Sequence, residues 1–408
     1  MKEKYYKAYK FRLLPTDEQK ILLAKTFGCT RFVYNYFLKE KQEHYLLNKK
    51  TLNYNNCSAS LTKLKKQEEY KWLNDVAAQA TQASLRNLEN AYQNFFKKKS
   101  KFPKFKKRSG HNSFHCVQDF KVFPDRIQVI KFKEGIKYIK HREIKGEVCS
   151  ITISKTPTGK YYASILCELP KQQPLPKTGK SVGIDLGLKD FIITSDGQKV
   201  ANARFLKRYQ KKLAKAQKHF SRKQKDSNRR ERQRIKVAKI YEKITNSRND
   251  LQHQVSSRLV KKYDLIAVED LNVQGMVKNH CLSRAISDVS WSSFVTKLKY
   301  KAEWYGRDLV VIDRFYPSSK TCSNCLHIKE EMSLNERLWI CPKCNTEHDR
   351  DVNASKNILQ RGLTLKSTGT VDYRHGVEVR PKAEQSVEGI DCEVSKKKNV
   401  RKYVLKPS

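Results

Sequence analysis

Two short apolar segments that end in acidic residues constrain the fold of this chain more than any other feature. Residues 181–187 and 264–270 have the composition of buried strands. The first carries Asp185 near its end, and the second ends in Glu269 and Asp270. Alternation places Asp185 opposite the apolar side chains of its strand, and Glu269 and Asp270 on opposite faces of theirs. A carboxylate on a strand suited to burial is unfavourable unless it meets a cation or a ligand. The two segments therefore predict strands of an α/β domain with acidic side chains at their ends.

A third acidic element lies at residues 348–354, which open a helix whose core face includes Ala354 and Ile358. Asp349 and Asp351 lie at the start of this helix, where an acid is also a common cap. A turn, a strand edge and a helix cap are therefore the ordinary alternatives for the three acidic elements.

Phosphodiester hydrolysis gives these acidic elements a shared role. Two divalent ions roughly 3.5–4 Å apart can clamp the attacking and leaving oxygens, and Mg²⁺ prefers carboxylate oxygens and water as ligands. Bound metal also relieves the mutual repulsion of clustered carboxylates. The sequence therefore predicts that Asp185 bridges two magnesium ions, with Glu269 and Asp351 on either side. Asp349 and Asp270 are the nearest substitutes.

Four cysteines in two tight pairs predict a structural zinc ribbon. Each pair encloses two residues and fifteen residues separate the pairs, which is the spacing of a two-knuckle, four-thiolate site with no open coordination position. Leu338 and Trp339 are expected to form a small apolar cap, and His348 is left out because four thiolates complete the tetrahedron. The expected ligands of one Zn²⁺ are Cys322, Cys325, Cys341 and Cys344.

The charge of the chain predicts a polyanionic partner. Lys and Arg number 85 against 41 Asp and Glu, a formal charge of +44, which would repel itself in a lone compact protein. A membrane surface is the competing polyanion, but no apolar run approaches the ~20 residues that span a bilayer. The N-terminus lacks the apolar stretch of a secretory signal, and seven of the 11 cysteines are scattered singly. We therefore expect a cytoplasmic, nucleoid-associated protein with no membrane partner.

The N-terminal half has the pattern of a small β-barrel with a helical insertion. A strand is expected over residues 5–13, and Thr16 with Gln19 forms a capping box that starts helices reaching to about residue 100. Strands are expected over residues 120–169, with a turn at 158–159, and a proline-rich linker follows. The stripe formed by Leu85, Leu88, Tyr92 and Phe95 is interpreted as core packing.

Two segments combine cations in ways that suit nucleic acid. Phenylalanines alternate with lysines around residues 102–108, a mix that suits base stacking and phosphate neutralisation, although a basic linker looks the same. Residues 207–248 predict a basic helical hairpin that is broken at 226–228. Acids are scarce there, which favours phosphate contact over a solvated face of mixed charge. The candidate contacts are Lys104, Lys106, Lys211, Lys212, Arg229 and Arg230.

Taken together, these motifs resemble the TnpB (OrfB-type) family of transposon-encoded proteins, relatives of the type V CRISPR effectors. The resemblance covers residues 5–362 and departs from the family at Leu326 and Asn345, where glycine often follows the second cysteine of a knuckle. The matching segments are residues 82–88, 102–105, 183–190, 268–271, 285–291, 300–302, 317–322 and 349–358.

The resemblance implies an RNA-guided, Mg²⁺-dependent endonuclease that cuts double-stranded DNA next to a short transposon-adjacent motif. It implies RuvC-type two-metal hydrolysis, with the catalytic residues falling on Asp185, Glu269 and Asp351. The guide would be a noncoding RNA from the right end of the transposon, bound by one protein monomer. Gln82 and Gln79 are candidates for base contacts, with an ordinary helix surface as the alternative.

The resemblance also implies a multidomain α+β fold with an RNase H-like (RuvC) α/β nuclease domain and an inserted zinc ribbon. The expected divisions are a wedge-like barrel at 1–14 and 102–170, a helical recognition domain at 15–101, a linker at 171–180, the RuvC domain at 181–319 and 346–365, the zinc ribbon at 320–345, and a disordered tail at 366–408.

Three other functions share parts of the pattern. Sugar kinases and actin-like ATPases share the superfold but need glycine-rich phosphate loops, and glycine makes up only 15 of 408 residues here. A non-catalytic RNA-guided regulator would lack one of the three acids, and all three are present. A transposase proper would join strands, which RuvC-type hydrolysis does not require.

Overall fold

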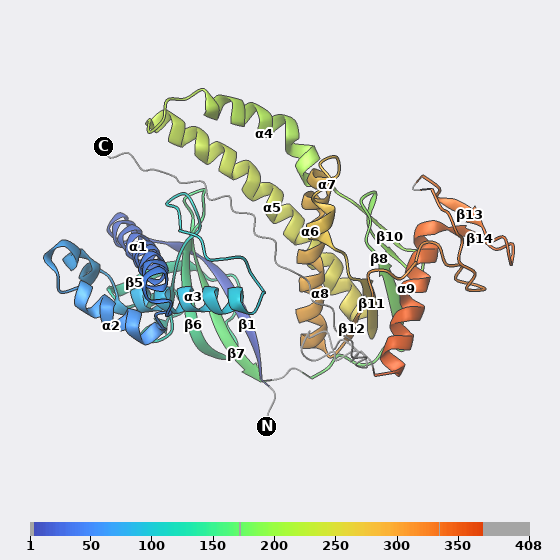
Figure 1. Cartoon of the computed structure of the whole chain (residues 1–408), viewed down its shortest axis with the longest axis horizontal. Coiled ribbons are helices and arrows are strands. Elements are labelled where there is room, and N and C mark those ends of the chain that lie inside the picture. Colours follow the sequence, from blue (N-terminus) through green and yellow to red (C-terminus); the bar gives the residue numbers. More distant parts are fainter. Residues whose placement is uncertain (1–3, 171–172, 334, 370–408) are drawn as a thin grey trace.

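A computed structural model describes residues 4–170, 173–333 and 335–369 of the chain. The described residues form two lobes, with an N-terminal lobe of sheet and helices and a C-terminal lobe built on a second sheet (Figure 1). Both lobes mix helices and strands, as the predicted multidomain α+β class requires.

The N-terminal lobe contains an antiparallel sheet of seven strands in the order β2-β6-β7-β1-β5-β4-β3. The N-terminal strand pairs with β7 and with β5, which confirms that it joins the sheet of the later strands. The first of those later strands, β2, precedes residue 120 and was missed. Closure of the sheet into a barrel stays a prediction. The strands are β1 (Lys4–Leu14), β2 (Asn112–Cys116), β3 (Phe120–Val122), β4 (Arg126–Val129), β5 (Phe132–Ile139), β6 (Glu147–Lys155) and β7 (Tyr161–Pro170).

The helices of this lobe are inserted between β1 and β2. The predicted capping box is present, because Thr16 accepts a hydrogen bond from the backbone of Gln19 and the Gln19 side chain bonds back. Leu85, Leu88 and Tyr92 are buried as the stripe predicts. The helices are α1 (Asp17–Asn48), α2 (Tyr54–Leu64), the 3-10 helix η1 (Glu68–Asp75) and α3 (Ala78–Phe96).

The C-terminal lobe is built on a five-stranded sheet in the order β10-β9-β8-β11-β12. The strand β11 runs parallel to β8 and to β12, whereas β9 runs antiparallel to β8 and to β10. The strands are β8 (Ser181–Asp185), β9 (Asp190–Thr194), β10 (Lys199–Ala201), β11 (Leu265–Glu269) and β12 (Asp308–Ile312), followed by the ribbon strands β13 (Leu338–Ile340) and β14 (Glu347–Asp349).

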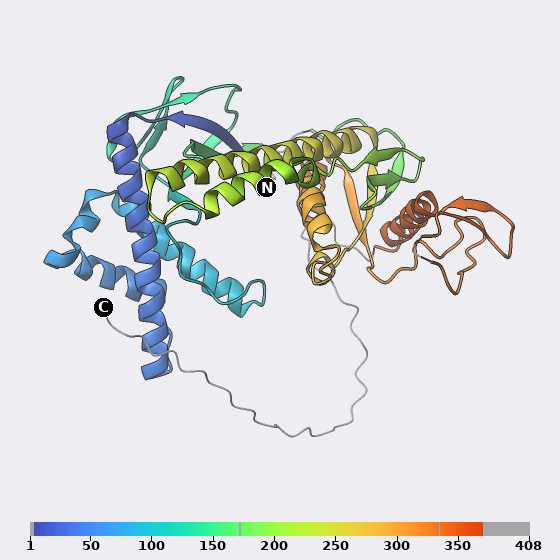
Figure 2. The same cartoon turned by 90° about the horizontal axis from the view of Figure 1, so that it is seen from above.

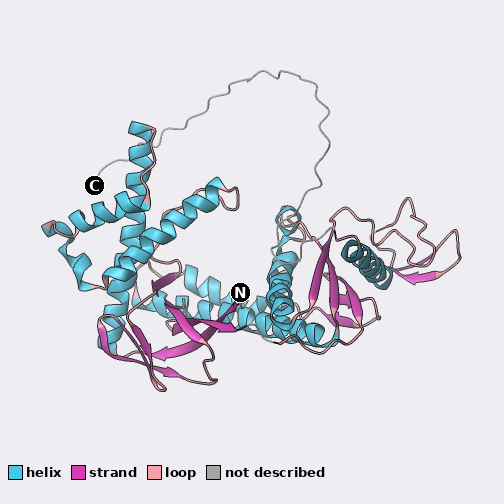
Figure 3. Ribbon diagram, turned by 90° about the horizontal axis from the view of Figure 1, so that it is seen from below, coloured by secondary structure: helices cyan, strands magenta, loops and turns pink. Residues whose placement is uncertain are grey.

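Helices cover both faces of this sheet (Figure 3). On one face, Val182 and Val268 pack with residues of α5, α7 and α8. On the other face, Leu265 and Ala267 pack with Ile358 of α9. The C-terminal helices are α4 (Phe205–Ser221), α5 (Asn228–Lys262), α6 (Val273–Met276), α7 (Ser283–Val289), α8 (Trp291–Tyr305) and α9 (Arg350–Ser367).

A long helical hairpin, formed by α4 and α5, reaches from the C-terminal lobe over the N-terminal sheet (Figure 2). Glu242 of α5 accepts hydrogen bonds from Thr158 (3.2 Å) and Lys160 (3.0 Å) at the β6–β7 turn. A second contact joins the rings of Tyr5 and Trp304, whose centroids are 6.0 Å apart. The two lobes therefore touch at both the hairpin and α8.

The chain segments at the ends of the C-terminal lobe differ in part from expectation. Helix α9 continues to Ser367, so the first residues of the expected tail are helical, while residues 370–408 lie outside the described part. Before β8, the backbone of Thr178 and Gly179 donates to the carboxylate of Asp264, which fixes the end of the expected linker. Among the described helices, none combines the length and apolar character needed to cross a bilayer.

Candidate active site and zinc site

Two of the three predicted acids lie at the ends of neighbouring parallel strands. Ile184 of β8 is the register partner of Val268 of β11, so the next residues, Asp185 and Glu269, follow side by side. The apolar partners Ile184 and Val268 face α5 and α8. Because side chains alternate along a strand, Asp185 and Glu269 share the opposite face of the sheet.

Helix α9 brings the third acid to this same face. A Cβ atom on Gly183 would lie 2.0 Å from the carbonyl oxygen of Ser355, so the helix packs directly on the strand that carries Asp185. Asp351 lies in the first turn of α9. The sequence therefore brings together three acids that lie far apart along the chain.

The pKa of Asp185 is consistent with two other carboxylates close by. Burial, together with the carboxylates of Glu269 and Asp351, raises the pKa of Asp185 to about 7, although Arg350 opposes this rise. Burial also raises the pKa of Glu269. A carboxyl group that two other carboxylates repel gains most from a bound cation. An all-carboxylate donor set suits a hard divalent ion such as Mg²⁺.

Neighbouring side chains hold two of these acids, and the sequence alone did not reveal them. Ser318, just after β12, donates its hydroxyl hydrogen to Glu269. Arg337, just before β13, donates to both carboxylate oxygens of Asp351, at 3.0 and 2.8 Å. The guanidinium of Arg350 lies 3.2 Å from the same carboxylate. A cation that binds Asp351 must therefore replace its contact with Arg337.

The two substitute acids have other roles. Asp349 is the N-cap of α9, where it accepts hydrogen bonds from the backbone of Asp351 and Val352, and it also pairs with Lys199 at 2.6 Å. Asp270 forms an ion pair with Arg314 and is half exposed. The strand register places Asp185 and Glu269 side by side, and the choice of Asp351 over Asp349 stays a prediction.

The four predicted zinc ligands converge. The sulfur atoms of Cys322, Cys325, Cys341 and Cys344 all lie within 4.8 Å of one another. Four thiols at this separation suit a tetrahedral Zn²⁺. Among the residues that the structure describes, no second group of three or more His, Cys, Asp or Glu side chains brings its ligand atoms this close together. The three acids are thus less closely gathered than the thiols.

The surroundings of the thiols correct one detail of the sequence analysis. Leu338 was expected to cap the site, but its side chain is 64% exposed, so this prediction was wrong. Trp339 is buried and packs against the ring of His348 at a tilt, with ring centroids 4.8 Å apart. His348 places its Nε2 atom 3.0 Å from the sulfur of Cys322, so it supports a ligand from outside the group of four.

Both knuckles keep the backbone that glycine usually supplies. Leu326 has a φ of 62° and Asn345 a φ of 53°, the left-handed region that favours glycine. Asparagine adopts this region readily, whereas leucine does so at a cost. The replacement of glycine at these positions therefore leaves the knuckle geometry intact. Strand β14 pairs with β13 and extends past residue 345, where the ribbon was expected to end.

The ribbon is tied to the helix that carries Asp351. Asn353 of α9 accepts a hydrogen bond from the backbone of Ser323 (2.9 Å) and donates to the carbonyl of Thr321 (2.7 Å). Asn357, one turn later, donates to the carbonyls of Ser318 and Thr321. The position of the zinc ribbon is therefore coupled to the acidic site.

The basic hairpin is present, with its predicted break capped by Ser227 at the start of α5. A groove of about 600 Å³ between α4 and α5 includes Lys212 in its lining, and Lys211 and Arg229 are exposed. Arg230 behaves differently, because its guanidinium donates to the carbonyls of Phe220 (3.4 Å) and Lys223 (2.6 Å) at the end of α4. These bonds give Arg230 a structural role in the hairpin.

The remaining nucleic-acid candidates lie in the N-terminal lobe. Gln82 is exposed on α3, whereas the Gln79 amide donates to Asp119 at 2.5 Å. Lys104 is exposed in the extended segment after α3. The ammonium of Lys106 lies 3.9 Å from the centre of the Tyr34 ring, so it is already bound to the protein.

Known proteins match this chain over most of its length. Three domain families match separate parts of the chain. A helix-turn-helix domain matches residues 1–50, and the OrfB_IS605 family, described as a probable transposase, matches residues 164–280. The Cas12f1-like TNB domain matches residues 291–358. A Streptomyces pristinaespiralis protein named "Putative RNA-guided DNA endonuclease" is 38% identical over 95% of this chain and 96% of its own length. The chain belongs to the TnpB (OrfB-type) family.

Further TnpB relatives and one solved structure agree with this membership. "Putative RNA-guided DNA endonuclease InsQ" of Escherichia coli (strain K12) is 31% identical over 90% of this chain and 94% of its own length. A chain in the cryo-EM structure of the Cas12f1-sgRNA-target DNA complex matches with a TM-score of 0.55 at 13% identity, covering 87% of this TnpB-family chain and 98% of its own. At that identity, the likeness concerns the fold alone, which is that of a type V effector.

Proposed function

We propose that this chain is an RNA-guided endonuclease that cuts double-stranded DNA next to a short transposon-adjacent motif. The names of its relatives supply the activity and the RNA partner. The observation that carries the proposal for this chain is the pKa of Asp185, raised by burial and by the carboxylates of Glu269 and Asp351, because such a cluster needs a cation. The guide is proposed to be a noncoding RNA from the transposon's right end, bound by one protein monomer.

The proposed chemistry is RuvC-type hydrolysis at the three acids. Asp185, Glu269 and Asp351 would hold two Mg²⁺ ions, which supply an activated water and stabilise the leaving oxygen. Ser318 fixes the carboxylate of Glu269, and Arg337 holds that of Asp351, where it would compete with a bound cation. The wider excess of positive charge would hold the nucleic acids by their phosphates.

The domain organisation is proposed as the sequence analysis gives it. A wedge-like barrel comprises residues 1–14 and 102–170, a helical recognition domain 15–101 and a linker 171–180. An RNase H-like RuvC domain at 181–319 and 346–365 surrounds the zinc ribbon at 320–345. The order of strands in the five-stranded sheet and the helices on both its faces support the RuvC assignment. Action on DNA inside the cell follows from the proposed substrate.

A cleavage assay on matched variants tests the proposal. The protein is purified with its RNA, and Mg²⁺ and duplex DNA that matches the guide are added. Asp185→Ala is expected to bind this DNA but to cut it on the order of a thousandfold more slowly, because several kcal/mol of metal-derived stabilisation are lost. Asp270→Ala, which removes a half-exposed acid next to Glu269, is the matched control and should cut normally. Equal cutting by both variants would exclude the proposed site.

A further inference from the structure

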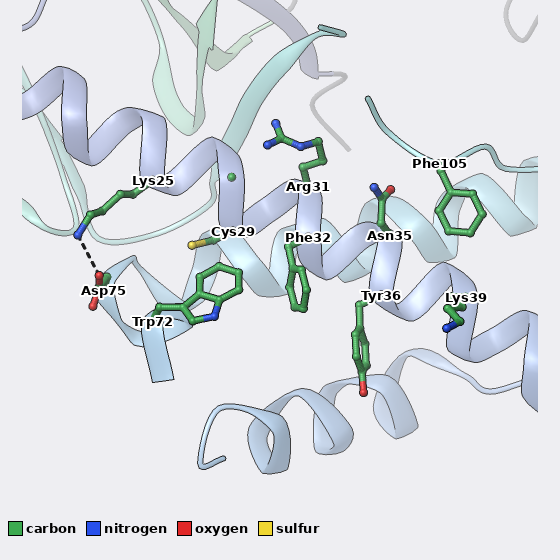
Figure 4. A pocket seen from close by; sticks show the side chains of 11 residues that line it. Lys25, Cys29, Arg31, Phe32, Asn35, Tyr36, Lys39, Trp72, Asp75 and Phe105 are labelled. Atoms are coloured by element: carbon green, nitrogen blue, oxygen red, sulfur yellow. Dashed lines mark hydrogen bonds and ion pairs between the residues drawn. The ribbon is translucent and has the colours of Figure 1, made fainter. Parts of the chain in front are cut away.

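A groove on the outer side of α1 combines aromatic rings with cations. Its volume is about 830 Å³, and it is lined by one face of α1, by residues of η1 and by Phe105 from the extended segment after α3. Figure 4 shows the rings of Phe32, Tyr36 and Trp72 in a row along the groove, with Phe105 on its far side. The catalytic acids contribute nothing to this groove, because they lie in the other lobe.

The rings in the groove are positioned but incompletely covered. Phe32 contacts Trp72 edge-on, with centroids 5.0 Å apart, and Tyr36 at 5.6 Å. The indole N–H of Trp72 donates to the carbonyl of Glu69 at 3.0 Å, which fixes the ring. Trp72 is nevertheless 41% exposed and Phe105 is 52% exposed. Fixed aromatic faces that stay open to water are suited to stacking on a planar partner.

The segment that carries Phe105 is fastened to α1. The side-chain amide of Asn35 accepts a hydrogen bond from the backbone N–H of Lys106 (2.7 Å) and donates to the carbonyl of the same residue (2.9 Å). Lys106 also covers the ring of Tyr34. These contacts hold Phe105 at the edge of the groove opposite Trp72.

A glycine in the middle of α1 leaves open space in the groove. Gly28 lines the groove, and a Cβ atom placed there would meet nothing within 4 Å. Glycine weakens a helix, and here neither packing nor backbone conformation requires it. An approaching ligand would make use of the free space over the backbone at Gly28.

The charge of the groove suits a phosphate. Lys25, Arg31 and Lys39 line it, and Asp75 is the one acid among its lining residues. Lys25 pairs with Asp75 at 3.0 Å, and Lys39 lies 3.6 Å from Glu43. Arg31 donates to the side-chain oxygen of Asn112 at 3.4 Å. The lining still holds three cations against one acid. In Figure 4 the side chain of Arg31 leaves α1 on the side opposite the ring of Phe32, so the cations flank the row of rings.

We propose that this groove binds an unpaired base of the RNA partner, stacked on Trp72, with the adjoining phosphate held by the cations of the lining. The inference rests on the proposed function for the presence of that RNA. Unpaired bases of RNA loops and ends are free to stack on aromatic side chains, whereas the bases of duplex DNA are already stacked on one another. A single-stranded RNA segment is therefore the occupant that the rings and cations fit.

Binding of a fluorescein-labelled, single-stranded RNA to the full chain tests the proposal by anisotropy. Trp72→Leu removes the stacking ring, and Gly28→Leu fills the floor where the fold has room for a side chain. Each variant is expected to raise Kd by about 5- to 100-fold, the effect of losing one base stack. Trp72→Phe keeps a ring and should restore most of the affinity. Tyr45→Leu, at an exposed ring of α1 outside the groove, is the matched control and should bind normally.

The outcomes separate this site from the nuclease proposal. Unchanged RNA affinity of Gly28→Leu and Trp72→Leu would overturn the inference, whatever the cleavage assay gives. Weaker binding of labelled duplex DNA with unchanged binding of RNA would also overturn it, because the occupant would then be DNA. Weaker RNA binding by both variants supports the groove, whatever the cleavage assay shows. Equal cleavage by Asp185→Ala and the unmodified chain would contradict only the nuclease proposal.

Discussion

Gly183 is the residue on which the distance between α9 and the strand of Asp185 depends. A Cβ atom at this position would lie 2.0 Å from the carbonyl oxygen of Ser355 and 2.5 Å from the backbone nitrogen of Leu359. We therefore expect Gly183→Ala to lower the free energy of unfolding by about 1–3 kcal/mol or more, since backbone atoms must move. Cleavage should fall as well, because α9 carries Asp351. Chemical denaturation and single-turnover cleavage measure the two effects.

The control for this prediction is a Gly→Ala substitution at a glycine that lies in a helix, Gly28 of α1. Gly28→Ala adds the same methyl group where nothing lies within 4 Å, so it should raise stability by up to about 1 kcal/mol. A Gly183→Ala variant as stable as the unmodified protein would show that the close packing of α9 on β8 is not present in solution.

At the scale of single residues, the sequence predicts which acids share a face but not what holds them. Alternation along β8 and β11 was enough to identify Asp185 and Glu269. The contacts of Ser318 and Arg337 depend on how the ribbon turns back onto α9, and no local pattern encodes that turn. For the same reason, Leu338 was wrongly expected to be buried, and the bonds that hold Arg230 in the hairpin were not predicted.

At the scale of elements, the contact between α5 and α8 contains two buried lysines without an acid beside them. Lys301 donates to the hydroxyls of Ser256 and Ser257 and to the carbonyl of His253. Burial, with a smaller contribution from Lys297, lowers the pKa of Lys301 from 10.5 to about 8. Between pH 8 and 10.5, Lys301 is therefore protonated in the unfolded chain and deprotonated in the folded chain.

This difference predicts how stability changes with pH. Since the unfolded state holds more protons in this window, the contribution of Lys301 to the free energy of unfolding rises with pH, by up to roughly 3 kcal/mol between the two pKa values. Lys301→Met should lack this rise, and denaturation of both proteins across the window measures it. Lys299→Met, at an exposed position of the same helix, should follow the unmodified protein. Parallel curves for Lys301→Met and the unmodified protein would contradict the assignment.

The zinc ribbon and α9 form a second coupled pair of elements. Asn353 and Asn357 bind the ribbon backbone, so loss of zinc is expected to release the ribbon and to displace Asp351. A chelator selective for Zn²⁺, with Mg²⁺ kept in excess, should abolish cleavage and expose residues 320–349 to protease while the seven-stranded sheet stays protected. Metal analysis, limited proteolysis and restoration by added Zn²⁺ measure this effect. Cys281→Ser, which changes an exposed cysteine outside the ribbon, should keep one zinc per chain.

Elements with strong local signals were predicted well from the sequence. The capping box of α1, the basic hairpin and the alternation of β7 all depend on neighbouring residues, and all are present. Strand β2 was missed because its five residues follow a basic loop and gain their place only by pairing with β6. The N-terminal groove was not predicted either, because η1 and Phe105 meet α1 only in the folded chain.

At the scale of the whole molecule, charge gives the last prediction. The groove between α4 and α5 is lined by five lysines and contains no acid among its lining residues, so it should hold phosphates of the nucleic acid. Replacing Lys212, Lys236 and Lys239 with glutamine should make the slope of log K against log salt concentration shallower by about 2–3. Fewer phosphates are then neutralised, so fewer counterions are released on binding. Binding of the RNA measured over a series of salt concentrations gives this slope. The matching triple arginine variant keeps the charge and should keep the slope, and a glutamine variant that also keeps it would show that nucleic acid does not reach this groove.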